Sequence, residues 1–308
     1  MSKSCIITGG SGLVGSNFKD GIKINSSHCD LMNYDESYNK IKSFNPDSII
    51  HCAAMVGGLY YNIQHPLKFF EKNIQMNSNI LKISHELGVK KFIGFLSTCI
   101  FPDNLGRPYQ ETDLHIGPPH DSNFGYAYAK RMLEVKIRAY RKEFGYKYFC
   151  VIPTNVYGYN DNFDIDNGHV VPALIHKIYN AKKNNEDLVI KGTGKAKREF
   201  IFAQDLANIC NYLLNHYDGD DSIIVSDSDN EIAIKELVDI LVEVSNFKGN
   251  VIYDTSYSDG QLVKKTDNSK LKNILENFEF TPLEKGLKKT YEWFENNYEE
   301  ARKWKIMY

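Results

Sequence analysis

The stretch Cys5-Ile-Ile-Thr-Gly-Gly-Ser-Gly-Leu-Val-Gly15 decides the fold of this chain. Its apolar start, Cys5 to Thr8, predicts a short buried strand, and glycines follow at positions 9, 12 and 15. In a strand–turn–helix unit such glycines allow a tight turn, a close approach of the backbone to a pyrophosphate and close helix packing. The stretch therefore predicts a dinucleotide site. The predicted contacts from this loop are Gly9, Gly12, Leu13, Val14 and Gly15.

Strand-like and helix-like patterns alternate through the first half of the chain. We expect strands at 5–8, 48–53, 92–97 and 148–153, and helices at 34–43, 66–87 and 123–144. Such alternation is typical of a doubly wound parallel α/β sheet of the Rossmann type. The alternation weakens after about residue 155, which predicts a dinucleotide-binding domain over 1–155 and a smaller α/β substrate-binding lobe over 156–308. We expect segments near 203–230 to return to the first domain.

The bulk properties exclude several classes of function. The 308 residues have a formal net charge of −2 and show no basic tract, which disfavours nucleic acid or an anionic membrane as a partner. No apolar run is long enough to cross a bilayer. The six cysteines include no CxxC pair, so we expect no metal site, no disulfide framework and a reducing cytoplasm.

A possible catalytic triad follows the glycine loop in the chain. Ser97 ends a predicted strand, and Lys130 follows Tyr126 by four positions on a predicted helix. The ammonium on the same helix face could lower the pKa of the phenol, which could then exchange a proton with a sugar oxygen. The same spacing occurs in Tyr38/Lys42, which we interpret as a surface pair. The order glycine loop, serine, Tyr-x-x-x-Lys is similar to that of short-chain dehydrogenase/reductases.

Two further residues are candidates for a second proton transfer. The layout is similar to that of sugar-nucleotide 4,6-dehydratases, which place Asp-Glu after the Ser-Thr, whereas this chain has Cys99 and Ile100. Isoleucine cannot act as an acid, so dehydration is disfavoured, but a Cys99 thiolate could remove a proton beside a ketone. His169 is the candidate acid, although a histidine just before a helix is more often a capping or surface residue.

The end of the second predicted strand bears on the choice of cofactor. The stretch Ile22–Asp30 has no acidic residue at the immediate strand end to hold ribose hydroxyls. This absence favours NADP(H) over NAD(H). We expect Asp30 and Leu31 to lie near the adenine. The candidates for the extra phosphate are Lys23, Ser26, Ser27 and His28.

Several motifs resemble those of the GDP-L-fucose synthases, which are extended short-chain dehydrogenase/reductases. They are Met55-Val-Gly-Gly58, Leu96-Ser-Thr-Cys-Ile-Phe-Pro102, Asn123-Phe-Gly-Tyr-Ala-Tyr-Ala-Lys130, Pro153-Thr-Asn-Val156, Asp161-Asn-Phe163 and Gly168-His-Val-Val-Pro172. The resemblance implies conversion of GDP-4-keto-6-deoxy-D-mannose to GDP-L-fucose, by epimerisation at C3 and C5 and reduction of the C4 ketone with NADPH. It implies that Cys99 is the base and His169 the acid. Tyr126 would donate a proton in reduction, Ser97 would hold the C4 oxygen and Lys130 would tune Tyr126.

The resemblance also implies the remaining binding residues and a homodimer. Two helices, near 66–87 and 123–144, would form a four-helix interface between the subunits. The implied cofactor contacts outside the glycine loop are Ala53, Ala54, Phe95, Leu96, Thr98, Lys130, Pro153, Asn155 and Val156. The implied substrate contacts are Asn155, Lys177, Lys191, Arg198 and Asp259.

Two alternatives stay open at this stage. Lys191 occupies a position that is usually tryptophan in the family, which leaves room for another substrate. The first alternative is a C4 reductase of a related GDP-4-keto sugar, such as GDP-6-deoxy-4-keto-heptose, with one epimerisation or none. The second is a binding protein that senses a dinucleotide, which is disfavoured because Ser97, Tyr126 and Lys130 are all present.

Overall fold

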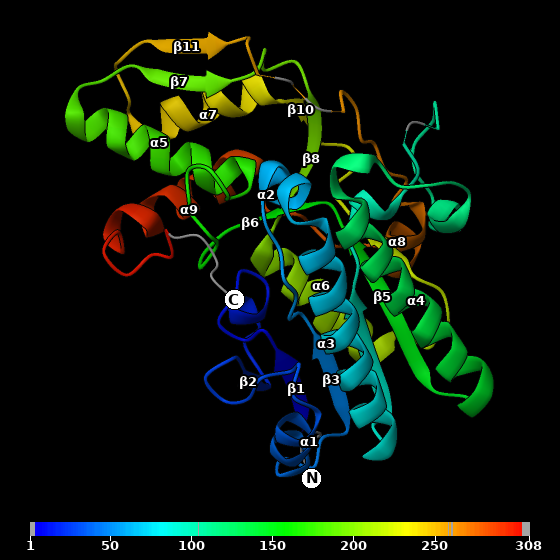
Figure 1. Ribbon diagram of the computed structural model, residues 1–308. Coiled ribbons are helices and arrows are strands. Elements are labelled where there is room, and N and C mark those ends of the chain that lie inside the picture. The colour runs from blue at the N-terminus through cyan, green and yellow to red at the C-terminus, as the bar shows by residue number, and fades with distance from the viewer. Residues whose placement is uncertain (1–3, 104, 258, 260, 304–308) are drawn as a thin grey trace.

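The computed structural model describes residues 4–103, 105–257, 259 and 261–303 (Figure 1). Within these residues, six parallel strands form the central sheet in the order β2-β1-β3-β4-β5-β9. The strands are β1 (Cys5–Thr8), β2 (Ile22–Ile24), β3 (Ser48–His51), β4 (Lys91–Phe95), β5 (Lys147–Pro153) and β9 (Ile223–Val225). The strand order reverses direction between β1 and β3, and such a switch point opens a crevice at the carboxyl ends of the strands. The predicted doubly wound parallel sheet is confirmed.

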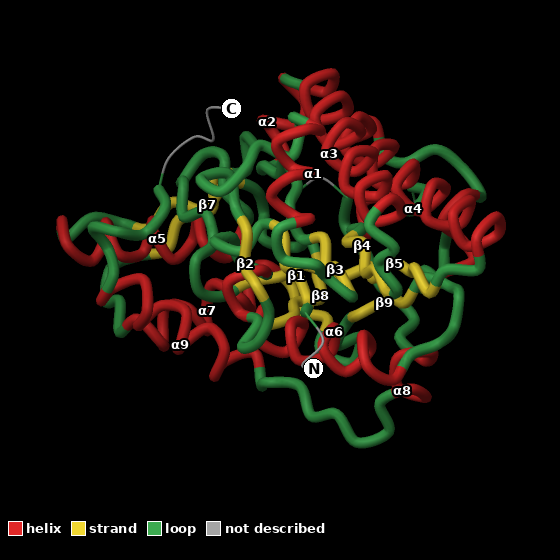
Figure 2. The backbone as a smooth tube through the Cα atoms, turned by 90° about the horizontal axis from the view of Figure 1, so that it is seen from below, coloured by secondary structure: helices red, strands yellow, loops and turns green. Residues whose placement is uncertain are grey.

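Helices cover both faces of this sheet, as Figure 2 shows from below. On one face lie α1 (Tyr34–Lys42), α3 (Pro66–Glu86) and α4 (Phe124–Phe144), and on the other lie α6 (Ala203–His216) and α8 (Ser269–Ile274). Successive strand residues point to opposite faces. Ile6 and Ile49 accordingly join one core cluster, and Ile7 and Ile50 join the other. Both faces are buried, which explains the continuous apolar runs in the sequence.

The segment after the glycine loop differs from the sequence prediction. The expected helix is a three-residue 3₁₀ turn, η1 (Gly15–Asn17). Phe18 adopts an extended conformation and is buried in the core. Only Phe18 to Gly21 then separate this turn from β2, so the chain has no room for a longer helix. The backbone N–H groups that could bind a pyrophosphate at the end of β1 therefore come from the glycine loop and not from a helix.

The second part of the chain has a hydrophobic core of its own, which includes Phe163, Ile175, Leu237 and Phe294. It contains β6 (Asn155–Tyr157), β8 (Lys197–Phe202) and β10 (Glu231–Ala233) in one small sheet, and β7 (Leu188–Lys191) paired with β11 (Val251–Asp254). Its helices are α5 (Val170–Asn184), α7 (Ile234–Ser245) and α9 (Leu283–Asn296). Because α6 and β9 pack in the cores of the large sheet, we infer a boundary near residue 155, with 203–225 returning to the first domain.

Short elements complete the chain between the larger ones. They are α2 (Leu59–Gln64), η2 (Thr98–Ile100), η3 (Glu111–His115) and η4 (Asp121–Asn123). The six cysteines are free thiols. No helix of the described residues is long and apolar enough to span a membrane. Within the same residues, no three His, Cys, Asp or Glu side chains lie together in a group that could hold a metal ion.

Candidate active site

The glycine loop forms a backbone cradle at the end of β1. Gly9 has a φ of 68°, and a Cβ on it would lie 2.8 Å from the Ala53 nitrogen. A Cβ on Gly15 would overlap the carbonyl oxygen of Gly9. The Gly12 N–H donates to that same carbonyl at 2.9 Å. Side chains at positions 9 and 15 would fill the cradle, so the loop fits the close approach of a pyrophosphate.

A buried polar chain fixes the strand ends beneath this loop. The Thr8 hydroxyl accepts a hydrogen bond from the Ala53 N–H at 3.2 Å and therefore donates its own proton to His51 Nδ1, which lies 2.8 Å away. His51 Nε2 then donates to Asn77 Oδ1 at 3.0 Å. Burial, with a smaller effect of the Lys130 charge, lowers the pKa of His51 to about 3, which agrees with this neutral ring. This series of hydrogen bonds connects β1, β3 and α3.

The end of β2 joins the glycine loop on its other side. The Gly10 N–H donates to the Ile24 carbonyl at 2.8 Å, and Lys23 Nζ donates to the Ser16 carbonyl at 2.8 Å. The Lys23 ammonium is therefore hydrogen-bonded to the backbone just after the glycine loop. The exposed turn after β2 presents Ser26, Ser27 and His28.

The two residues predicted to lie near the adenine come after that turn. The Asp30 carboxylate accepts from the Met32 N–H at 2.9 Å, and the Leu31 carbonyl accepts from Asn79 Nδ2 on α3 at 2.9 Å. They lie between β2 and α3, at the same edge of the sheet as the glycine loop.

The predicted catalytic residues converge where β4 ends. Ser97 and Cys99 come shortly after β4, and the Ser97 side chain is close enough to act on the pKa of the Cys99 thiol. Lys130 on α4 is 1 % exposed and its Nζ donates to the Phe95 carbonyl at 2.8 Å. The same Nζ lies 5.7 Å from the centre of the Tyr126 ring. Because the Cys99 charge also acts on the Tyr126 phenol, the structure brings all four side chains together.

The protonation state of Tyr126 differs from the sequence interpretation. Burial is the largest cause and the Cys99 charge the second, and together they raise the pKa of the phenol above its ordinary value. The expected lowering by Lys130 does not prevail, because the effect of burial on the phenol is larger. Burial also lowers the pKa of Lys130 itself, to about 8. The neutral phenol that results is the form that donates a proton.

The Cys99 thiol lies in a mixed environment. Burial raises its pKa above the ordinary value, and this effect outweighs the lowering by the charge of Lys264, the contact with Ser97 and the charge of Lys130. Lys264 is a residue that sequence reasoning missed. It belongs to a polar stretch without helical or strand periodicity, so the sequence gives no signal for its position.

His169 comes from the second part of the chain, before α5. It is exposed and precedes the first residue of α5. The loop before it packs on the Met55–Gly58 segment, since the Gly58 N–H donates to the Asn167 carbonyl at 2.7 Å. Within the described residues, no hydrogen bond links His169 to Cys99 or Tyr126. Its role as an acid therefore stays a prediction.

The remaining predicted cofactor residues lie along the carboxyl edge of the sheet. Ala53 and Ala54 follow β3, Phe95, Leu96 and Thr98 lie at the end of β4, and Pro153, Asn155 and Val156 lie at the junction of β5 and β6. Thr154 lies between Pro153 and Asn155, within the segment 153–156 that the sequence predicts to contact the cofactor. Its hydroxyl is buried and has no hydrogen-bond partner among the described residues, so it fits contact with a bound polar group.

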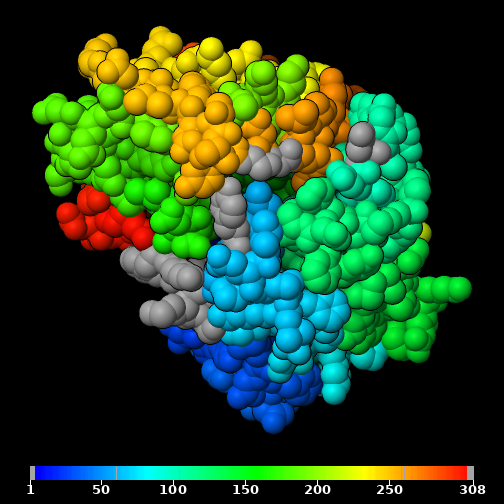
Figure 3. Space-filling model, turned by 45° about the horizontal axis from the view of Figure 1, so that its top comes forward, coloured from blue at the N-terminus to red at the C-terminus, as the bar shows by residue number. Residues whose placement is uncertain are grey.

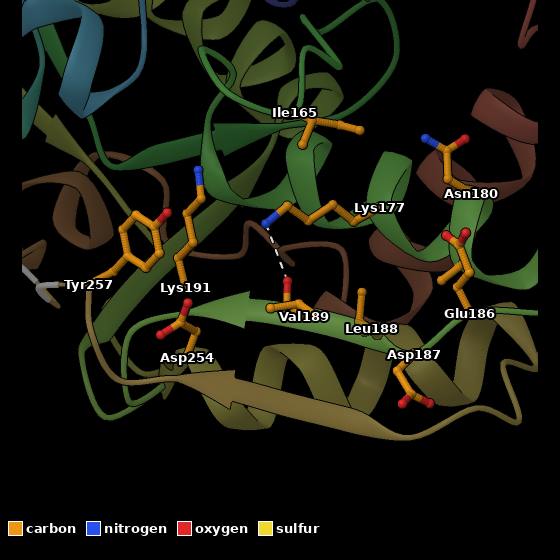
Figure 4. Close-up of a pocket in the computed structure, with 11 residues that line it drawn as sticks. Ile165, Lys177, Asn180, Glu186, Asp187, Leu188, Val189, Lys191, Asp254 and Tyr257 are labelled. Carbon is orange, nitrogen blue, oxygen red and sulfur yellow. Dashed lines mark hydrogen bonds between the residues drawn. The ribbon is translucent and has the colours of Figure 1, made fainter.

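A cleft between α5 and the β7–β11 pair contains two of the predicted substrate residues (Figure 4). The cavity has a volume of about 350 Å³. Lys177 Nζ donates to the Val189 carbonyl at 3.3 Å. Lys191 Nζ lies 3.4 Å from the Asp166 carboxylate and 5.1 Å from the centre of the Tyr257 ring. Two ammonium groups therefore line one cleft, together with the carboxylates of Glu186, Asp187 and Asp254.

The other three predicted substrate residues lie elsewhere. Arg198 is on β8, where burial lowers its pKa while the Glu231 and Asp259 charges oppose that shift. The Asp259 carboxylate accepts from the Thr193 N–H at 2.7 Å and from the Thr193 hydroxyl at 2.5 Å. Asp259 therefore holds the turn after β7. Asn155, also predicted to bind substrate, donates through Nδ2 to the Glu199 carbonyl at 2.8 Å.

The parallel sheet, the glycine cradle and the Ser97–Tyr126–Lys130 group define a dinucleotide-dependent oxidoreductase. Residues 5–225 match the profile of the NAD dependent epimerase/dehydratase family. The chain is 44% identical to a GDP-L-fucose synthase of Dictyostelium discoideum, over 98% of both chains. It superimposes on a GDP-L-fucose synthetase from Naegleria fowleri bound to NADP with a TM-score of 0.93 and 38% identity, covering 98% of this chain and 95% of that one. The chain therefore belongs to the NAD dependent epimerase/dehydratase family, and within it to the GDP-L-fucose synthases.

A more distant solved structure shares the same fold. A GDP-6-OMe-4-keto-L-xylo-heptose reductase from C. jejuni superimposes with a TM-score of 0.87, covering 96% of this chain and 99% of that one. Its sequence identity is 22%, so this likeness shows the shared fold alone.

Proposed function

We propose that the protein converts GDP-4-keto-6-deoxy-D-mannose to GDP-L-fucose, as an NADPH-dependent 3,5-epimerase and 4-reductase. The observation that supports this best is the position of Cys99. Cys99 lies two residues after Ser97 at the end of β4, and its charge acts on the Tyr126 phenol, so one sugar ring could meet a base and a proton donor in a single site. The 44% identity to the Dictyostelium enzyme supports the same substrate.

In the reduction, Ser97 and Tyr126 act on the C4 oxygen of the substrate. The bound cofactor supplies a hydride to C4. The Ser97 hydroxyl donates a hydrogen bond to the ketone oxygen, and the Tyr126 hydroxyl transfers its proton to that oxygen as the new C–H bond forms. Lys130, bound to the Phe95 carbonyl, stabilises the phenolate left behind.

In the epimerisation, Cys99 and His169 exchange protons with carbon. The thiolate removes the proton beside the ketone, so the C–H bond breaks, an S–H bond forms and the electron pair moves to the C4 oxygen. His169 then donates a proton to the opposite face of the same carbon. No oxidant is consumed, and hydrogen bonding to the C4 oxygen stabilises the enediolate.

NADPH is the proposed cofactor on two grounds. The Naegleria fowleri relative is bound to NADP. In this chain the turn after β2 presents hydroxyls and an imidazole, and the first carboxylate there, Asp30, already binds the Met32 N–H. Residues 25–29 of this turn contain no carboxylate that would repel a ribose phosphate. The GDP moiety would meet Lys177 and Lys191 in the cleft and Arg198 on β8.

The reaction in heavy water tests this function. With NADPH and GDP-4-keto-6-deoxy-D-mannose, we expect a GDP-L-fucose product with deuterium at both C3 and C5, measured by proton NMR. Reduction without deuterium would make the protein a C4 reductase only. The absence of any turnover with this substrate would point to a larger GDP-4-keto sugar.

We also infer a homodimer, which the free thiols and cofactor use would place in the cytoplasm. Two neighbouring helices, α3 and α4, share an exposed apolar cleft of about 480 Å³. Figure 3 shows this face with the atoms of α3 in cyan beside those of α4 in green. A second copy would cover the apolar side chains symmetrically. They are Pro66, Leu67, Phe70, Phe124, Tyr128 and Met132.

Phe70→Glu is expected to convert the dimer to a monomer. Phe70 is 36% exposed in the isolated chain, so the carboxylate costs little in a monomer but would be buried without a partner at the interface. Sedimentation velocity measures the change, and Ile252→Glu on the exposed side of β11 is the control because Ile252 is 46% exposed. A wild-type chain that sediments as a monomer would contradict the dimer.

A further inference from the structure

The segment Met55–Gly58, which comes after β3, joins the two parts of the chain through backbone contacts. The Gly58 N–H donates to the Asn167 carbonyl at 2.7 Å, and Asn167 is two residues before His169. A Cβ on Gly58 would lie 2.9 Å from the Gly168 carbonyl oxygen and 3.0 Å from the Asn167 carbonyl oxygen. A side chain at position 58 would therefore overlap the backbone just before His169. Figure 1 shows the start of α2 beside the loop that precedes α5.

Two buried asparagines hold Met55–Gly58 from the first domain. Asn73 on α3 accepts from the Met55 N–H through Oδ1 and donates to the Met55 carbonyl through Nδ2, each at 3.0 Å. Asn62 on α2 donates through Nδ2 to the Gly57 carbonyl at 2.8 Å. Both amide groups are buried, where a lost hydrogen bond is costly. The segment is therefore fixed at its two ends, to α3 and to α2.

The loop on the other side of this contact is a compact turn. The Gly168 N–H donates to the Asp164 carbonyl at 2.9 Å. A Cβ on Gly168 would lie 2.5 Å from that carbonyl oxygen and 2.6 Å from the Asn162 carbonyl oxygen. The Asp164 carboxylate also accepts from the Asn167 N–H at 2.7 Å. The turn ends at His169, the N-cap of α5, so the contacts that hold the turn also set where His169 lies.

Tyr126 packs against the same segment. Its side chain belongs to a small apolar cluster with Met55, Tyr61 and Phe69, and its ring centre lies 6.3 Å from that of Phe69. Helix α2, which follows the segment directly, packs against η4, the turn that leads into α4 and Tyr126. One segment therefore contacts both the loop that carries His169 and the helix that carries the proton donor for the reduction.

We propose that Met55–Gly58 sets the position of His169 for proton donation to the sugar, with Gly58 as the positioning residue. This inference rests on the proposed function and names a residue that acts through His169. The His169 side chain is exposed, so its position depends on the backbone contacts of its loop. Epimerisation needs the acid on the face opposite the base, and a misplacement of about 1 Å can lower a rate by about 10²-fold.

The stereochemistry of deuterium entry tests the proposal. Gly58→Ala adds a methyl group against the backbone carbonyls at 167 and 168, and should displace His169 while Cys99 stays in place. In heavy water without NADPH, Cys99 then still removes the substrate proton, exchanges it with solvent and returns deuterium to the same face. We expect deuterium at C3 and C5 with retained configuration. The share of inverted product should fall by about 10²-fold, measured by proton NMR.

Two further variants control for the substitution itself. Gly117→Ala is the matched control, since a Cβ there would make an ordinary contact with the Pro102 Cβ at 3.6 Å. It should invert as much as the wild type. Asn62→Ala adds no atoms and removes the hydrogen bonds to the carbonyls of 57 and 58, so it should lower inversion in the same direction but less. Fluorescence titration should give wild-type NADPH affinity for all three variants, because the glycine loop is unchanged.

The outcomes separate positioning from a general packing role. Deuterium entry without inversion in Gly58→Ala supports the proposal. If Gly58→Ala inverts as much as the wild type, the proposal is wrong. It is also wrong if NADPH binding, deuterium entry and inversion are all lost together, because Gly58 would then only maintain the fold.

Amide hydrogen exchange followed by mass spectrometry separates failure of this proposal from failure of the proposed function. A wild-type protein that takes up no deuterium at C3 and C5 would contradict the epimerase function. In that case, faster amide exchange of Gly58→Ala confined to peptides covering 55–62 and 161–170 would still support the contact that holds His169. Unchanged amide exchange in those peptides would overturn it.

Discussion

Tyr126→Phe is expected to lower kcat for NADPH oxidation by about 10²- to 10⁴-fold, the usual contribution of a positioned proton donor. The substitution removes only the hydroxyl. The ring keeps its edge contact with Phe69, at 6.3 Å between ring centres, so the fold and cofactor binding should persist. Stopped-flow absorbance of NADPH measures the loss, and fluorescence titration measures cofactor binding.

The chain contains a matched control for this variant. Tyr38 and Lys42 on α1 have the same spacing, and Lys42 Nζ lies 5.4 Å from the centre of the Tyr38 ring. Tyr38→Phe should leave kcat unchanged, because α1 does not border the strand end where Ser97 lies. If Tyr126→Phe reduced the ketone at the wild-type rate, Tyr126 would lose its role as the donor.

The Tyr126/Lys130 and Tyr38/Lys42 pairs show how far the sequence alone can predict the site. Local patterns placed the strands and helices within a few residues, because apolar periodicity and glycine turns are local properties. The order of motifs distinguished Tyr126 from Tyr38, although spacing alone could not. The sign of the pKa shift at Tyr126 escaped prediction, because it depends on how deeply the folded site buries the phenol.

The missed features share a non-local cause. The Lys264 charge acts on Cys99, and the residues on either side of Lys264 are hydrogen-bonded to Tyr109 and to Lys197 on β8, far away in the sequence. The prediction of a helix after the glycine loop was wrong. Phe18 is extended and buried in the core, so the turn ends after Asn17. Such outcomes depend on packing between distant segments, which no single stretch encodes.

Cys99→Ser is expected to abolish the entry of solvent deuterium at C3 and C5 while hydride transfer to C4 persists. A serine hydroxyl has almost the same size as the thiol and can keep the contact with Ser97, but it is far too weak an acid to supply an anion near neutral pH. Exchange should fall by about 10²- to 10⁴-fold, the range for loss of a general base. Proton NMR of the substrate in heavy water, without NADPH, measures exchange alone.

The stereochemistry of the product then gives an independent check on the same variant. With NADPH present, Cys99→Ser should yield a reduced sugar that keeps the C3 and C5 configuration of the substrate, because Ser97, Tyr126 and Lys130 are all intact. Cys5→Ser is the control, since Cys5 begins β1 and lies at the opposite end of that strand from the glycine loop. A GDP-L-fucose product from Cys99→Ser would mean that another group removes the protons. Because the raised pKa keeps Tyr126 neutral, the phenol is poorly suited to replace that base.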